Sequence, residues 1–248
     1  MTDIYQAPSA NLTEEGARPA ITATLEKGIA GEYDFSISEV LGEAWRRTNG
    51  NKGKIWLAFI LYLAVVIPFF LVLKIYLGHD KFADWLQWAV IRSVDVSLSA
   101  GIAMLGVKLA VGAPVESNEV YQHIEKAVWF VVAAILMFLM ISLGMICLVL
   151  PGVYLAVSYF LVTLLIAEKN LRPWQAMEAS RKALTHHWFK LFFLAVAYGL
   201  IVIASALPAG IGLIWTLPMG VIIRGIVYRT VFGYEAQKGE ISSQGAAK

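Results

Sequence analysis

The hydrophobic and polar positions along the chain form long apolar runs separated by short polar stretches. A run of roughly 20 apolar residues suits a helix that crosses a hydrocarbon core of about 30 Å. The pattern therefore predicts an all-α integral membrane helical bundle with about six transmembrane helices. The predicted spans are 55–77, 90–109, 127–149, 152–167, 191–207 and 210–232.

Prolines and glycines predict where these spans turn or break. From Ala127 to Ala167 the chain has no charged residue, a stretch too long for one crossing, so Leu150-Pro151-Gly152 is expected to divide it into a hairpin. A second minimal turn is predicted at Pro208-Ala209-Gly210. Pro218 is expected to break the last span, because proline removes one helical hydrogen bond.

Two shorter segments predict cytoplasmic interfacial amphipathic helices, 37–49 and 173–187. Each has apolar residues on one side and basic residues nearby, a pattern typical of helices that lie in the headgroup layer. The first is expected to end at Asn49-Gly50. Glu178 and Lys182 are four residues apart and predict an ion pair. Glu43 to Arg47 recurs as Glu178 to Lys182, which indicates either an internal repeat or the common preference of such helices for early Glu and late Lys or Arg.

The distribution of Lys and Arg predicts the orientation in the membrane. With both termini in the cytoplasm, the outer side holds only Lys74, Lys81 and Arg92, as the positive-inside rule requires. Residues 1–34 read as a disordered cytoplasmic tail, 35–233 as a single helical membrane domain and 234–248 as a second cytoplasmic tail. The start of the chain lacks the pattern of a secretory signal.

The composition is typical of a membrane protein and limits the classes of partner that we expect. Hydrophobic residues make up 58% and charged residues 15% of the 248 residues, and the formal net charge is +2. This charge is too near neutral to indicate nucleic acid as a partner. We expect contacts with the lipid bilayer and its anionic lipids, and a homo-oligomer or another membrane protein as the kind of protein partner. Cys147 is the single cysteine, so a disulfide within the chain is excluded.

The candidate functional residues are charged groups in or beside the spans. Arg92 and Asp95 are three residues apart and predict an intramembrane pair. Candidate contacts for lipid or another anion are Arg46, Arg47, Arg181, Lys182 and Arg224. Arg224 lies deep in the last span, where it either binds a phosphate or another anion in a cavity or extends to the cytoplasmic headgroups.

The sequence carries no recognisable catalytic constellation, metal site or cofactor motif. His186 and His187 are adjacent, so their side chains point in different directions on a helix, and a metal site needs three or four convergent ligands. We therefore expect a non-enzymatic protein without a cofactor.

A further set of residues carries a resemblance to a known family. Leu150 to Tyr154, Ala167-Glu168, Gln175 to Met177, Gly210-x-Gly212 and Pro218 resemble a set of uncharacterised bacterial inner-membrane proteins. That set is similar to the membrane domain of some glycerophosphodiester phosphodiesterases. The resemblance implies an all-helical protein of the bacterial cytoplasmic membrane, and it supplies no catalytic residues.

Two functions follow as hypotheses. The first is envelope maintenance or a scaffold role, in which the basic interfacial helices bind anionic lipid. The alternative is a small transporter or lipid-handling protein with a cavity near Arg224, because spans interrupted by Pro68, Pro151 and Pro218 are typical of such proteins.

Overall fold

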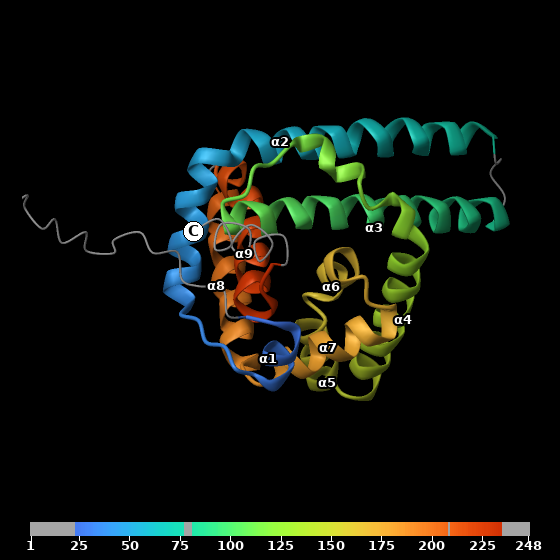
Figure 1. Cartoon of the computed structure of the whole chain (residues 1–248). Helices are drawn as coiled ribbons and strands as arrows, with labels where there is room; N and C mark the ends of the chain where they lie inside the picture. Colours follow the sequence, from blue (N-terminus) through green and yellow to red (C-terminus); the bar gives the residue numbers. More distant parts are fainter. Residues whose placement is uncertain (1–22, 77–80, 208, 235–248) are drawn as a thin grey trace, which may run out of the picture.

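The computed structural model describes residues 23–76, 81–207 and 209–234, and every regular element in these ranges is helical (Figure 1). This confirms the all-α prediction. Residues 77–80, Pro208 and most of the two predicted tails, 1–22 and 235–248, lie outside the described residues. The elements are α1 (Leu25–Ala30), α2 (Ile37–Tyr76), α3 (Lys81–Val111), η1 (Ser117–Tyr121), η2 (Ile124–Lys126), α4 (Ala127–Cys147), α5 (Val149–Ser158), α6 (Val162–Lys169), α7 (Pro173–Thr185), α8 (Trp188–Ala206) and α9 (Leu213–Phe232).

Five helical segments of the described chain are long and apolar enough to cross a membrane, and they coincide with the first five predicted spans. They are Ile37–Tyr76, Val94–Val111, Glu119–Cys147, Val149–Lys169 and Trp188–Ala206. The sixth predicted span corresponds to α9, which is not among the five because Arg224 and Arg229 lower its hydropathy. α9 instead packs against α2, α3 and α8 and has buried residues along most of its length. The count of six therefore stays a prediction.

The first predicted interfacial helix and the first span form one helix of 40 residues, α2. The predicted helix end at Asn49-Gly50 is wrong. The Thr48 hydroxyl donates to Ala44 O (2.7 Å) and the Asn51 amide donates to Arg47 O (3.1 Å), and side-chain bonds of this kind often accompany a bend in a helix. Figure 1 shows that α2 changes direction between its blue start and the cyan part beside α3. Glycine is a common cause of helix bending, and α2 contains Gly50 and Gly53.

The uncharged stretch forms the predicted hairpin, but its break lies three residues earlier than the proline. Leu148 is extended (φ −161°, ψ 135°), and Pro151 occupies the first turn of α5, where its missing N–H costs no helical bond. Gly144 and Gly152 lie in close backbone contact across the hairpin. A second break at Tyr159–Leu161, which the sequence pattern did not predict, divides the span 152–167 into α5 and α6.

α2 continues through Pro68, so the predicted interruption of the first span is wrong. α9 likewise continues through Pro218, so the predicted break of the last span is wrong. Proline at this position leaves the carbonyl of Ile214 without its helical donor. The indole Nε1 of Trp56 in α2 donates to that carbonyl at 2.9 Å. The helix is therefore preserved because a neighbouring side chain supplies the missing hydrogen bond.

α7 matches the second predicted amphipathic helix, but its apolar side faces protein. Met177 and Leu184 are buried, and α7 packs against α1, α4, α5 and α6. This packing brings the first half of α5 next to the start of α8, where Trp188 Nε1 donates to Tyr154 O (3.3 Å). The sequence placed these two segments on opposite sides of a bilayer. A direct contact is incompatible with a separation of about 30 Å, so that part of the prediction is wrong.

The segment 112–126 folds back between α2 and α3, where Figure 1 shows it in light green. Val120 is fully buried and its backbone lies directly against Gly101 of α3. The Tyr121 hydroxyl donates to Leu61 O of α2 at 3.0 Å. The small residues Ser97 and Gly101 thus admit a loop segment between the two helices.

The end of the predicted disordered tail is ordered. α1 is capped by the Thr24 hydroxyl and followed by Gly31 at φ 79°. It packs on α7 and on the end of α9, because Gly28 lies against Val231 O and the Phe232 ring. Tyr33 continues the contact by donating to Ala183 O at 2.9 Å, and burial raises the pKa of its hydroxyl.

We expect Gly28→Leu to detach α1 from the body. A Cβ at this position would lie 2.5 Å from Val231 O, a backbone atom that cannot move aside. Limited trypsin digestion should cut the variant after Lys27 much faster than the unmodified chain. Gly42→Ala in α2 serves as the control, because its Cβ would meet only Arg46 at 3.5 Å; slow cleavage of Gly28→Leu would contradict the prediction.

Candidate functional site

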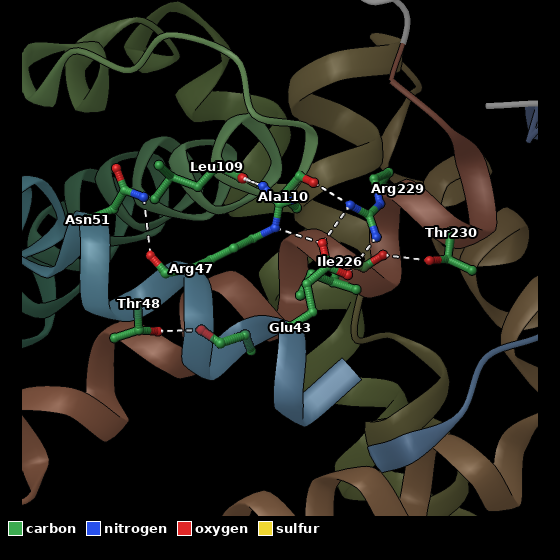
Figure 2. A network of polar contacts seen from close by, with 10 residues as sticks. Glu43, Arg47, Thr48, Asn51, Leu109, Ala110, Ile226, Arg229 and Thr230 are labelled. Atoms are coloured by element: carbon green, nitrogen blue, oxygen red, sulfur yellow. Dashed lines mark hydrogen bonds and ion pairs between the residues drawn. The ribbon is translucent and has the colours of Figure 1, made fainter. Parts of the chain in front are cut away.

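A charged cluster joins three helix ends (Figure 2). We call Glu43, Arg47 and Arg229 the Glu43 clamp. The Glu43 carboxylate accepts from Arg229 at 2.9 and 3.0 Å and from Arg47 at 2.6 Å. Arg47 also donates to Leu109 O (2.6 Å), and Arg229 donates to Ala110 O. The last carbonyls of a helix carry partial negative charge, so two guanidinium groups stabilise the end of α3.

Arg47 is one of the predicted contacts for lipid or another anion, but its guanidinium is directed into the protein. Arg46, on the next position of α2, has an exposed side chain. In α7, Arg181 bonds to Glu178 at 2.9 Å and Lys182 lies 3.3 Å from the same carboxylate, which confirms the predicted pair of Glu178 and Lys182. The hydrogen bonds from Arg181 hold the pKa of Glu178 below its usual value.

The predicted pair of Arg92 and Asp95 is present in α3. Asp95 also accepts a hydrogen bond from the hydroxyl of Tyr62 in α2. The sequence pattern did not indicate Tyr62, which lies 33 positions earlier along the chain. The pair is therefore a structural link between α2 and α3.

Arg224 occupies a different environment from the other arginines. It projects from α9 towards the break between α5 and α6, where its Nη2 donates to the hydroxyl of Thr163. Its charged carbon stands 5.3 Å from the centre of the Phe160 ring. Its Nε is buried without a hydrogen-bond partner in the described part of the chain, where no carboxylate pairs with the guanidinium either.

An apolar cavity of about 270 Å³ lies beside Arg224. Its walls come from α5, α8 and α9, and it shares Phe160 with the arginine. The lining residues are Ala156, Val157, Phe160, Leu191, Leu194, Ala195, Tyr198, Gly220 and Ile223. Gly220 leaves room for the Tyr198 hydroxyl, which donates to Thr216 O at 2.9 Å.

A polar pocket of about 300 Å³ lies at the other end of α6. Lys108 and Glu119 pair across it at 2.8 Å, and Gln122 and His123 contribute further polar lining. Glu168 also lines it and accepts a hydrogen bond from the hydroxyl of Tyr228. None of these residues was among the predicted site residues, because their partners lie on different elements of the fold.

The surroundings of Arg224 can hold an anion. Thr163 stands in the first turn of α6, and the start of a helix carries partial positive charge. The guanidinium adds a full positive charge with an unused donor. Among the described residues no group of three His, Cys, Asp or Glu side chains could hold a metal ion.

Comparison with known proteins finds no matching family model, no matching curated protein and no matching solved structure. The resemblance to bacterial inner-membrane proteins therefore stays a prediction from the sequence.

Proposed function

We propose that this chain is a lipid-handling protein of the bacterial cytoplasmic membrane that binds the acidic group of an amphiphile at Arg224. The apolar cavity next to it takes the hydrocarbon part. The observation that carries the proposal is the buried, unpaired Nε of Arg224, whose guanidinium lies over Phe160, a residue that lines an apolar cavity. This function is the alternative that the sequence offered beside a scaffold role.

Arg224 is half-buried, and the energetic cost of its buried, unpaired Nε supports a bound anion. A polar group that is buried without its hydrogen bonds costs on the order of 2–7 kcal/mol. A charged group that leaves water without a counter-charge costs several kcal/mol as well. Thr163 and the Phe160 ring offset part of this cost through one hydrogen bond and a cation–π contact. A phosphate or carboxylate would supply the missing acceptor and the missing charge.

The scaffold hypothesis depended on basic residues that face lipid. Arg47 and Arg181 are engaged with Glu43 and Glu178, which leaves Arg46 and Lys182 as the more exposed groups of that set. We propose a cytoplasmic location for both termini from the positive-inside rule, and a non-enzymatic role.

The test compares two ligands that differ only in the acidic group, hexadecyl phosphate and hexadecanol. The purified, delipidated full chain should bind the phosphate compound more tightly, with binding measured by native mass spectrometry. Arg224→Gln should weaken that binding at least tenfold, because a hydrogen bond to a charged group contributes about 1.5–3 kcal/mol. Binding of hexadecanol should change little.

Arg46→Gln is the matched control, since it removes an exposed arginine of α2 that does not line the cavity. Thr163→Val gives a second variant at the site if Arg224→Gln fails to fold, and it should weaken phosphate binding by a smaller factor. Binding of inorganic phosphate, which has no hydrocarbon chain, should be weaker than binding of hexadecyl phosphate if the ligand is an amphiphile. Equal affinity for the two hexadecyl compounds, or an unchanged affinity in both site variants, would contradict the proposal.

A further inference from the structure

Three environments follow one another along α9 and along the broken helix that faces it. On α9, Gly220 lines the apolar cavity, Arg224 lies four residues later, and Tyr228 four residues after that reaches Glu168 of the polar pocket. Residues four apart share one side of a helix and are separated by about 6 Å along its axis. The order along α9 is therefore apolar, cationic, polar.

The opposite wall has the same order. Phe160 lines the apolar cavity, Thr163 accepts from Arg224, and Ala167 and Glu168 line the polar pocket. The two elements, which are about 60 positions apart along the chain, therefore line the apolar cavity, the Arg224 contact and the polar pocket in the same order. A ligand held by Arg224 would reach an apolar cavity on one side and a polar pocket on the other, each about one helical turn away.

The polar pocket is close to neutral and rich in acceptors. The carboxylate of Glu119 is balanced by Lys108 at 2.8 Å, and that of Glu168 by Lys169 at 3.7 Å. Carboxylate oxygens are hydrogen-bond acceptors only, and the Glu168 carboxylate already accepts from the Tyr228 hydroxyl. Gln122 adds an exposed amide to the lining. Hydroxyl and ammonium groups of a ligand fit this lining, whereas a further acidic group does not.

We infer that the ligand is a phospholipid whose headgroup donates hydrogen bonds. Its acyl chain lies in the apolar cavity, its phosphate binds Arg224 and Thr163, and its headgroup enters the pocket between Glu119 and Glu168. The inference rests on the proposed function and adds the class of ligand. The two-carbon or three-carbon arm beyond a phospholipid phosphate suits a pocket one turn away.

The experiment measures binding of phospholipids with identical acyl chains to the delipidated full chain by native mass spectrometry. Phosphatidylethanolamine and phosphatidylglycerol, whose headgroups donate hydrogen bonds, should bind at least fivefold more tightly than phosphatidylcholine, which has no donor. Glu168→Gln should reduce this preference at least threefold. Glu125→Gln, an exposed carboxylate of η2 outside the pocket lining, should leave it unchanged.

The outcomes separate this inference from the proposed function. Equal binding of the three lipids, with Arg224→Gln still weakening all of them, overturns the headgroup inference alone. Full binding by Arg224→Gln overturns both. If Glu168→Gln does not fold, Gln122→Leu takes its place, and an unchanged preference in the folded variant contradicts the inference. Phosphoethanolamine without acyl chains should bind at least a hundredfold more weakly, and equal affinity would exclude a lipid as ligand.

Discussion

Gly225→Leu is expected to prevent the packing of α9 against α3 and to have the largest effect on stability of any single substitution proposed for this chain. A Cβ at Gly225 would lie 2.1 Å from Gly106 O and 2.6 Å from Val107 N. A Cβ at Gly106 would in turn lie 2.2 Å from Val221 O. Both clashes are with backbone atoms, so a side chain at either position must separate the two helices.

The expected loss is graded with side-chain size. Overpacking by small groups costs about 1–3 kcal/mol, so Gly225→Ala should lower the midpoint of thermal unfolding measurably, and Gly225→Leu should yield little folded protein. The matched control is Gly199→Ala in α8, where an added Cβ meets no atom within 4 Å. Since alanine favours helix over glycine by about 1 kcal/mol, the control should be neutral or slightly stabilising. Similar midpoints for Gly225→Ala and Gly199→Ala would refute the close crossing.

The contacts that the sequence predicted correctly are local ones. The pairs Arg92–Asp95 and Glu178–Lys182 follow from helical spacing alone, and both are present. The hairpin near Pro151 follows from the length of an uncharged stretch. Periodicity and length decide such features without knowledge of the neighbours.

The features that the sequence did not predict depend on partners far along the chain. Pro218 lies within a continuous helix because Trp56 supplies the missing donor, and Arg47 is directed inward because the end of α3 meets it. The helix from Ile37 continues past Asn49-Gly50 because packing of α2 against α3 and α9 outweighs a weak local preference. Tertiary contacts override local signals at each of these positions.

The candidate site was predicted only in part. Arg224 was identified because an arginine deep in an apolar run is costly unless it has a partner or a function. Its surroundings depend on the break at Tyr159–Leu161, which has no proline or glycine to indicate it. A pairing of α6 with α9 is required before Thr163 and Glu168 can be assigned to the site at all.

Glu43→Ala is expected to destabilise the chain by about 2–4 kcal/mol, because it leaves two partly buried guanidinium groups without their counter-charge. Glu43, Arg47 and Arg229 are each between 20% and 31% exposed, so water screens part of the effect, and the loss should fall below that of a fully buried pair. Thermal unfolding of the purified protein, followed by tryptophan fluorescence, measures the change. Glu39→Ala is the control, since it removes an exposed carboxylate one turn earlier in α2 and should be nearly neutral.

A double-mutant cycle of Glu43→Gln and Arg229→Gln then tests whether the clamp acts as one unit. The pair links α2 to α9 across 186 positions of the chain, and Arg229 retains Ala110 O as a partner when Glu43 is replaced. We expect the two losses to be non-additive, with a coupling of about 1–3 kcal/mol, because each single change strands the remaining partner. Simple addition of the two losses would mean that Arg229 stabilises the end of α3 on its own. In that case Arg229 would act mainly through Ala110 O, and Glu43 mainly through Arg47.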